Sequence, residues 1–399
     1  MKITNVLTGL LVFATSQIFS QWINTNCSGS GTAYDMIEAG GKLIVARGGI
    51  YSTTDGQNWS SISTGASFGS CRTLKNFSGS IYAGYTGSDF YTSTNNGTSW
   101  TSLSGKSGLA SVYSTSLYKN TNVIIYGINN GSGSTYYSTN NGTTWGTSQY
   151  NYGSGAQQGF ENTCYDIVEL NGTLFHSTYK YLFKSTNSGA IWSVVATAPS
   201  ISPGTVTSLC KINGGLLLSI YGSGVYRTTD DGATWTKVLG GSLGTLTNNM
   251  TRLYYENGVA IAGGASSQVY ISTDNGVNWT DITDTGMNIG DVVQSIKIFD
   301  NYIYIGTNTN VYKKVYDVGI RENEKINFSI HPNPTNNIIK FEGLNSIIVA
   351  TVRNTNGTSV KEAKIIDNSI DISELPRGIY VIELKDKEGK TGFTKFVKE

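Results

Sequence analysis

The stretch STDNGVNW, at residues 272–279, decides the fold of most of this chain because its pattern recurs. The same pattern stands at residues 93–100 (STNNGTSW), 138–145 (STNNGTTW), 185–192 (STNSGAIW) and 228–235 (TTDDGATW). In a looser copy that ends at Trp59, STTDGQNW, Thr54 takes the Asp or Asn place and Asp55 follows it. Such recurrence along one chain indicates a repeat architecture.

Each copy is predicted to form a hairpin turn. Asn and Asp side chains accept hydrogen bonds from nearby backbone N–H groups, and the following Gly adopts the positive φ that a tight turn needs. A β-rich run precedes each copy, such as residues 224–227 (GVYR), and a short strand such as residues 279–282 (WTDI) follows it. The turn therefore joins two antiparallel strands, and the Trp is an apolar anchor at the start of the second.

This pattern resembles the Asp-box, or sialidase-type BNR repeat, of β-propellers. The resemblance implies a structural turn at the outer, lower edge of each blade, with no catalytic role. The residues that it assigns to these turns are Asp55, Asn95, Asn140, Asn187, Asp230 and Asp274, together with Trp59, Trp100, Trp145, Trp192, Trp235 and Trp279.

The spacing of the copies predicts the number of blades. Their Trp residues are 41, 45, 47, 43 and 44 residues apart, the length of a four-stranded propeller blade. Three more strands, at 292–299, 302–306 and 311–314, follow the last copy, and residues 22–25 (WINT) resemble the strand that follows each copy. We therefore expect an all-β, seven-bladed β-propeller at residues 21–317, whose N-terminal strand completes the last blade and removes open sheet edges.

Residues 1–20 are expected to be a secretory signal peptide. Lys2 precedes an apolar segment at residues 6–19 that is too short to span a membrane, and Ser20 is small enough for the position before the cut. No later segment is apolar enough to cross a bilayer. The chain has 48 Gly, 25 Tyr and a net charge of +1, so its composition fits an exported β protein and implies no nucleic-acid partner.

The cysteines and histidines are too sparse to indicate a metal site or a cofactor. No CxxC pair occurs, and the two histidines, His176 and His331, lie in different predicted domains. The four cysteines, Cys27, Cys71, Cys164 and Cys210, are too few for a disulfide scaffold. They are interpreted as small buried thiols, with a Cys27–Cys71 bridge as the alternative.

The composition changes near the C-terminus. The 78 residues from Glu322 to Glu399 hold 11 Lys or Arg and 11 Asp or Glu, out of 55 charged residues in the chain. This shift predicts a domain boundary, with a polar linker at 318–325 and a small β-sandwich at 326–399.

The C-terminal segment resembles the type A sorting domain of the type IX secretion system of Bacteroidetes-type bacteria. The motif residues that carry the resemblance are Pro332, Asn333, Pro334, Leu375, Gly378 and Tyr380. The resemblance implies that outer-membrane export machinery recognises this domain, and that the protein is then secreted or attached to the cell surface. An ordinary adhesion sandwich is the alternative.

Three functions remain open for the propeller. The first is a binding module for surface glycans or another protein, which the many Tyr residues favour because they can stack on sugars. The alternative is a glycoside hydrolase of sialidase-like or polysaccharide-degrading type. The propeller has only four arginines, Arg47, Arg72, Arg227 and Arg252, and the residues 47–50 (RGGI) do not match the Arg-Ile-Pro element of sialidases. The third is a structural or adhesive surface protein. Since no dense acid pair is evident, we assign no catalytic residue.

A candidate ligand site lies where the chain enters the innermost strand of each unit. Aligning the units there gives a ring of two tyrosines, two carboxylates and two guanidinium groups, suited to stacking and hydrogen bonding with a polar ligand. The predicted ligand-binding residues are Tyr34, Asp35, Arg72, Tyr165, Asp166 and Arg252. As an alternative, Asp35 pairs with Arg72 or Asp166 within the channel and the charged residues only cap strands.

Overall fold

Strands dominate a computed structural model of the chain, which describes residues 21–65, 69–86, 90–103, 113–129, 135–153, 164–199, 205–241, 246–316, 328–344, 347–354, 359–365, 367–386 and 391–399. Within these ranges the one helix is a short 3-10 turn, η1 (Leu246–Asn248), so the predicted all-β fold is confirmed. The chain divides into two compact units, Met1–Tyr316 and Asp317–Glu399. The expected signal peptide at 1–20 lies outside the described residues.

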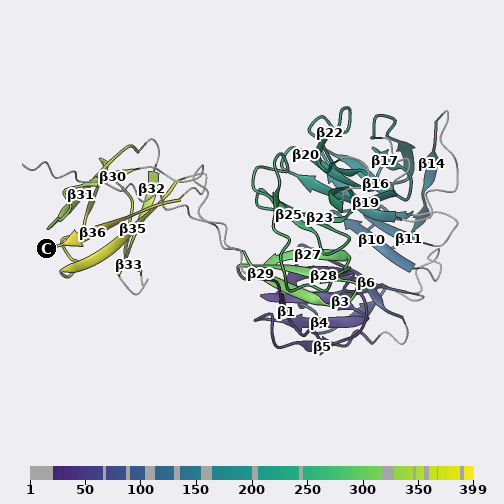
Figure 1. The fold of residues 1–399 in the computed structure, drawn as a ribbon, viewed down its shortest axis with the longest axis horizontal. Helices are drawn as coiled ribbons and strands as arrows, with labels where there is room; N and C mark the ends of the chain where they lie inside the picture. The colour runs from purple at the N-terminus through teal and green to yellow at the C-terminus, as the bar shows by residue number, and fades with distance from the viewer. Residues whose placement is uncertain are drawn as a thin grey trace, which may run out of the picture. The chain divides into compact units, whose positions relative to one another are not determined.

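Seven sheets make up the described part of the first unit (Figure 1). The first three consist of β2 (Asp35–Ala39), β3 (Lys42–Arg47), β4 (Gly49–Thr53) and β5 (Ser60–Ile62); β6 (Cys71–Phe77), β7 (Ser80–Tyr85), β8 (Phe90–Ser93) and β9 (Thr101–Ser102); and β10 (Tyr113–Lys119), β11 (Ile124–Asn129), β12 (Thr135–Ser138) and β13 (Gly146–Thr147). The fourth contains β15 (Cys164–Leu170), β16 (Thr173–Thr178), β17 (Leu182–Ser185) and β18 (Ile191–Val194), with β14 (Gln149–Asn151) added in parallel beside β18.

The remaining three sheets complete the first unit. They consist of β19 (Thr205–Ile212), β20 (Gly215–Tyr221), β21 (Gly224–Thr228) and β22 (Thr236–Leu239); β23 (Met250–Glu256), β24 (Val259–Gly264), β25 (Val269–Ser272) and β26 (Thr280–Asp281); and β27 (Val293–Phe299), β28 (Tyr302–Thr307), β29 (Val311–Val315) and β1 (Ile23–Asn24). The first strand of each sheet contacts the first strand of the next, from β2 through β6, β10, β15, β19 and β23 to β27, and β27 contacts β2. The sheets therefore form a closed ring around their inner strands.

The N-terminal strand closes this ring, as the sequence predicts. In β1, Ile23 pairs with Lys313 and Asn24 pairs with Tyr312, so the first strand of the chain completes the sheet of the last three. The backbone N–H and the hydroxyl of Thr25 both donate to the carbonyl of Val311, at 3.0 and 2.9 Å.

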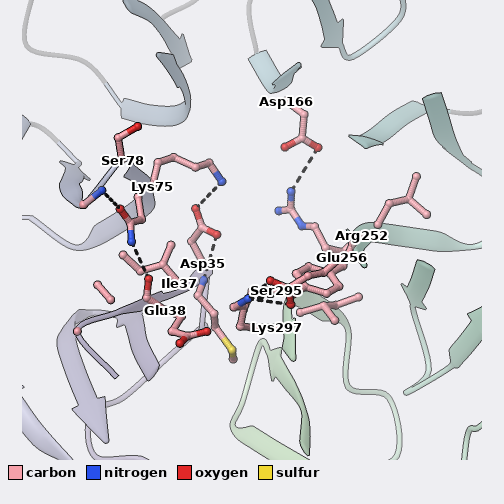
Figure 2. Close-up of a pocket in the computed structure, with 18 residues that line it drawn as sticks. Asp35, Ile37, Glu38, Lys75, Ser78, Asp166, Arg252, Glu256, Ser295 and Lys297 are labelled. Carbon is pink, nitrogen blue, oxygen red and sulfur yellow. Dashed lines mark hydrogen bonds and ion pairs between the residues drawn. The ribbon is translucent and has the colours of Figure 1, made fainter. Parts of the chain in front are cut away.

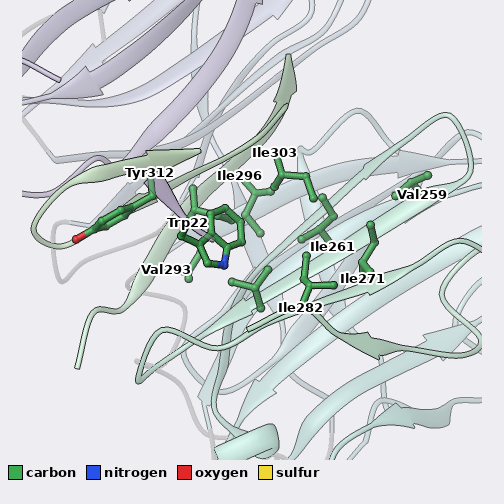
Figure 3. Close-up of a cluster of buried hydrophobic side chains, with 11 residues drawn as sticks. Trp22, Val259, Ile261, Ile271, Ile282, Val293, Ile296, Ile303 and Tyr312 are labelled. Atoms are coloured by element: carbon green, nitrogen blue, oxygen red, sulfur yellow. The ribbon is translucent and has the colours of Figure 1, made fainter. Parts of the chain in front are cut away.

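Trp22 anchors the closing strand in the interior. Its ring is 1% exposed and packs between the last two sheets, in a cluster that includes Ile261, Ile282 and Ile296 (Figure 3). Lys314 lies against the ring, with its Nζ 5.5 Å from the ring centroid, and donates to the carbonyl of Ile282 at 3.0 Å. The closing strand is therefore held by apolar burial as well as by backbone pairing.

The six repeated turns share one hydrogen-bond pattern. In the copy at 228–235, the Thr228 hydroxyl donates to Asp230 Oδ1 at 2.7 Å and accepts the N–H of Gly232 at 3.1 Å, while Asp230 Oδ1 also accepts the N–H of Thr234 at 2.9 Å. Asp231 and Gly232 both have positive φ, of 54° and 82°. The side chains thus replace backbone partners, as expected for a tight hairpin turn.

The other copies repeat these contacts. Hydroxyls donate to the side-chain oxygens of Asp55, Asn95, Asn140, Asn187 and Asp274 at 2.7–2.9 Å. The looser copy uses Thr53, two residues before Asp55. Of the six Trp residues in these turns, Trp192 is fully buried, whereas Trp59, Trp100, Trp145, Trp235 and Trp279 are half-buried. The Trp side chains of these turns are therefore buried to different degrees.

The described part of the second unit contains two sheets. One has the order β30 (Ser329–His331), β31 (Ile338–Glu342) and β34 (Ser369–Asp371). The other has the order β33 (Ser359–Ala363), β32 (Ile347–Asn354), β35 (Gly378–Asp386) and β36 (Thr391–Lys398). One cluster of buried side chains, including Ile339, Phe341, Ile382 and Phe396, draws on both sheets, so they pack as a sandwich.

Replacing Trp22 tests the closure. Trp22→Ala should lower the free energy of unfolding by about 3–5 kcal/mol, the usual loss for a large buried aromatic side chain. Trp100→Ala is the control and should cost less, because the Trp100 ring is already half-exposed. Denaturant unfolding of the full chain measures both. An equal loss in the two variants would contradict the anchoring role of Trp22.

The acid sensitivity of one repeated turn is a second test. Hydrogen bonds from Thr234 and Thr228 lower the pKa of Asp230 to about 2 from a usual value near 3.8. A lowered folded-state pKa stabilises the fold above about pH 4, and this contribution is lost as the pH falls toward 2. Asp230→Asn, which copies Asn187, should therefore lower the melting temperature most above pH 4 and little at pH 2. A difference that does not change with pH would contradict this linkage.

Candidate functional site

Six of the seven inner strands contain a β-bulge, and four of the candidate ring residues, Arg72, Tyr165, Asp166 and Arg252, lie at or beside it. The register shifts fall between Cys71 and Thr73, Ser114 and Ser116, Cys164 and Asp166, Val206 and Ser208, Met250 and Arg252, and Val293 and Ser295. Each bulge inserts one unpaired residue, which redirects the side chains around it. The candidate residues on β6, β15 and β23 thus share this local geometry, whereas β2, which begins at Asp35, pairs with β3 without a register shift.

Asp35 and Asp166 connect neighbouring inner strands. Asp35 Oδ2 accepts the N–H of Leu74, in the next inner strand, at 3.0 Å. In the same way, Asp166 Oδ2 accepts the N–H of Leu209 at 3.0 Å and the Ser208 hydroxyl at 2.8 Å. Both carboxylates therefore bind backbone N–H groups of the neighbouring inner strand.

Hydroxyl groups make similar connections elsewhere in the ring. Ser208 Oγ accepts the N–H of Leu253 at 3.2 Å, and Thr207 donates to the carbonyl of Met250 at 2.8 Å. Thr251 donates to Val293 at 2.6 Å, and Ser295 donates to Ala33 at 2.7 Å. These connections fix the spacing of the inner strands around the channel.

A pocket of about 670 Å³ lies between the inner strands (Figure 2). β2 and β6 line it as far as Gly40, Ser78 and Gly79, in the turns that follow these two strands. In an antiparallel meander, the turn after the first strand lies at the same edge as the turn after the third. The pocket therefore extends along the inner strands toward the end of the channel that carries the repeated turns.

The charged groups that line the pocket are mostly paired with each other. Lys75 Nζ is 3.0 Å from Asp35 Oδ2, and one Arg252 nitrogen is 3.6 Å from Asp166 Oδ2 (Figure 2). Lys297, which is buried, is 2.9 Å from Glu256 Oε1. The described wall thus presents neighbouring groups of opposite charge and no large field of one sign.

Tyr254 belongs to the third of these groups. Its hydroxyl accepts a hydrogen bond from Lys297 Nζ at 3.0 Å and donates to Glu256. Burial, followed by the Glu256 carboxylate, raises the pKa of Tyr254 above its usual range. The phenol therefore remains protonated, as a donor, at neutral pH.

The pocket includes only part of the candidate ring. Asp35, Asp166 and Arg252 line it, whereas Tyr34, Arg72 and Tyr165 do not. The Arg72 guanidinium instead lies over the Tyr34 ring, 4.5 Å from its centroid, and Asp35 pairs with Lys75 rather than with Arg72 or Asp166.

Sequence reasoning missed Glu38, Lys75, Tyr254, Glu256 and Lys297, which also line the pocket. Lys75, Tyr254 and Lys297 each stand two residues after the residue that follows the register shift in its strand, which is Thr73, Arg252 or Ser295. Side chains two apart along a strand point to the same side. Continuing the alignment by two residues along each strand would have identified them.

The four cysteines are free thiols, so the alternative Cys27–Cys71 bridge is not formed. Burial raises the pKa of Cys27 to about 11, although the nearby Arg47 opposes the shift. Burial also lowers the pKa of His176 to about 3. Across the described ranges, no group of three or more His, Cys, Asp or Glu residues is placed to hold a metal ion.

The predicted sorting residues have structural roles in the second unit. Asn333 Oδ1 accepts the N–H of Val397 at 3.0 Å, and its Nδ2 donates to the carbonyl of Lys395 at 3.0 Å. The Tyr380 hydroxyl donates to the carbonyl of Pro376 at 2.8 Å, and its ring stacks on Phe396. Leu375 is buried, and Gly378 begins β35.

Residues 329–399 match the family model of the secretion system C-terminal sorting domain. A type IX sorting domain of this kind directs a protein to the cell surface or the extracellular space, so this chain is secreted. Within the described residues, no helix has the length and apolar character needed to cross a membrane. A comparison of the sequence with curated proteins finds no match.

Solved structures share the propeller-like fold. YCF48 from Cyanidioschyzon merolae is 13% identical with a TM-score of 0.55, over 75% of this chain and 100% of its own. PorZ, a surface component of the type IX secretion system of Porphyromonas gingivalis, is 11% identical with a TM-score of 0.52, over 92% of this chain and 59% of its own. The Niastella koreensis GH74 enzyme is 18% identical with a TM-score of 0.54, over 73% and 44%. These identities establish similarity of fold alone.

Substitution separates the residues that connect strands from those that only line the pocket. Asp166→Ala leaves the N–H of Leu209 and the hydroxyl of Ser208 without their partner and should lower the free energy of unfolding by about 1–3 kcal/mol. Glu38→Ala is the control and should change it by less than about 0.5 kcal/mol, because this side chain is exposed. Thermal and denaturant unfolding measure both; an Asp166→Ala variant as stable as the wild type would contradict the connecting role.

Proposed function

We propose that the first unit is a seven-bladed β-propeller of the Asp-box type that binds an uncharged, hydroxyl-rich glycan in its channel pocket, outside the cell. The observation that carries this proposal is the paired charge of the pocket wall: Lys75 with Asp35, Arg252 with Asp166, and Lys297 with Glu256. A ligand of strong net charge would have to break these pairs. A neutral ligand with many hydroxyl groups can hydrogen-bond to both signs without separating them.

The size and the lining of the pocket support the same ligand class. A volume of about 670 Å³ is within the usual range for small-molecule sites and has room for a few sugar rings. Met36, Ile37, Leu253 and Ile296 supply apolar surface beside the charged groups. Sugar rings present apolar C–H faces as well as hydroxyls, so a mixed lining of this kind suits them.

Glycan binding is better supported than glycan hydrolysis. A glycosidase needs one carboxyl group as acid and a second as base or nucleophile, both directed at the substrate. Asp35 and Asp166 instead bind backbone N–H groups of the neighbouring strands and form ion pairs with Lys75 and Arg252. These contacts already account for their presence in the channel.

A panel of neutral and charged glycans tests the proposal, with the secreted protein as the binder and released sugar monitored in the same wells. Neutral glycans should bind and remain intact. Glu38→Ala and Lys75→Ala should each weaken binding about 5- to 10-fold, the loss expected for one hydrogen bond. Lys211→Ala is the matched control, because Lys211 pairs with Glu169 on inner strands but does not line the pocket.

Three outcomes would contradict the proposal. The first is preferential binding of charged glycans. The second is equal affinity of wild type, Glu38→Ala and Lys75→Ala, which would move the site away from the pocket. The third is release of sugar at a rate that Asp35→Asn or Asp166→Asn abolishes, which would favour the hydrolase.

A further inference from the structure

One edge of the larger sheet in the second unit is only partly covered. β36 is the last strand of the order β33-β32-β35-β36, so one side pairs with β35 and the other is an edge. Asn333 covers part of this edge by bonding to the N–H of Val397 and the carbonyl of Lys395. Thr335 extends the cover, since its N–H donates to Val397 at 2.9 Å and its carbonyl accepts from Glu399 at 3.0 Å.

The cover stops at the carbonyl of Lys395. In an antiparallel ladder, the backbone groups of alternate residues point to the same side, so those of Phe393 and the N–H of Lys395 also face the edge. Among the residues that the structure describes, no hydrogen bond uses these groups. The Phe393 side chain beside them is 46% exposed. The first half of β36 is thus an open strand edge with an adjacent aromatic side chain.

We propose that an extended segment of the outer-membrane export machinery adds as a strand to Gly392–Lys395 of β36 and packs an apolar side chain on Phe393. This unit is a sorting domain, so another protein must recognise it. Strand addition uses the free donors and acceptor that this edge presents, and a neighbouring side chain gives specificity.

The sorting motif fixes the end of this docking site. Asn333, between Pro332 and Pro334, occupies the carbonyl of Lys395 and so closes the edge to pairing beyond that point. Pairing with an incoming strand therefore cannot extend beyond Lys395, where the contacts of Asn333 begin. In this role Asn333 limits the site and does not itself contact the partner strand.

Two substitutions at Phe393 separate the contribution of its backbone N–H from that of its ring. In the full-length protein, expressed in a bacterium with a type IX system, Phe393→Ala removes the ring alone, whereas Phe393→Pro removes the ring and the N–H. That N–H points away from β35, so proline leaves the inner ladder intact. We expect the Ala variant, which loses only the ring contact, to be exported about threefold less than wild type, and the Pro variant to be exported at least tenfold less than the Ala variant and to accumulate in the periplasm. Equal export of the two variants would overturn the proposal.

The melting temperature of each purified full-length variant shows whether folding is responsible. If Phe393→Pro melts below Phe393→Ala, Lys395→Pro against Lys395→Ala asks the same question at the other open N–H, and equal export there overturns the proposal. Deletion of residues 329–399 is a separate control for sorting itself. Normal export of the deleted chain would refute the sorting role, whereas blocked export together with equal export of the Pro and Ala variants would refute strand addition alone.

Discussion

The pairing of β1 with β29 is the constraint on which the first unit depends. Without it, the last sheet would lack its outer strand, and Trp22 would leave the cluster between the last two sheets. Thr25 and Val311 are 286 residues apart in sequence, yet the entropic cost of closing a loop grows only with the logarithm of its length. Burial of one large aromatic ring, two backbone pairs and the contacts of Lys314 can therefore hold the ring closed.

A closed ring forces the inner strands together, and this crowding explains the polar residues around the channel. Each inner strand is the first strand of its sheet and has a strand partner on one side only. Asp35, Asp166 and Ser208 accept N–H groups from the neighbouring inner strand. Asp35 and Asp166 also line the pocket. The residues that would meet a ligand are thus held by the framework itself, which reduces the entropy lost on binding.

In the second unit a side chain covers part of a sheet edge, whereas in the first unit a strand, β1, completes the last sheet. Asn333 presents one acceptor and one donor to β36, in the spacing that a backbone partner would offer. A covered edge does not recruit other chains, and an open one does. The division of β36 into a covered and an open half is therefore consistent with a domain that has to be recognised by one partner without aggregating.

The sequence by itself determined the features that depend on local chemistry: the repeated turns, their spacing, the N-terminal strand that pairs with β29, and the C-terminal sorting motif. A turn is encoded by neighbours such as Thr228, Asp230 and Gly232, so it can be read without knowing the rest of the chain. The tertiary structure alone decided that Asp35 pairs with Lys75, that Trp192 is buried more deeply than the other Trp residues of the turns, and that Cys27 and Cys71 stay unbonded. These outcomes depend on how separate strands pack against one another, because the packing sets the distance between groups that are remote in sequence.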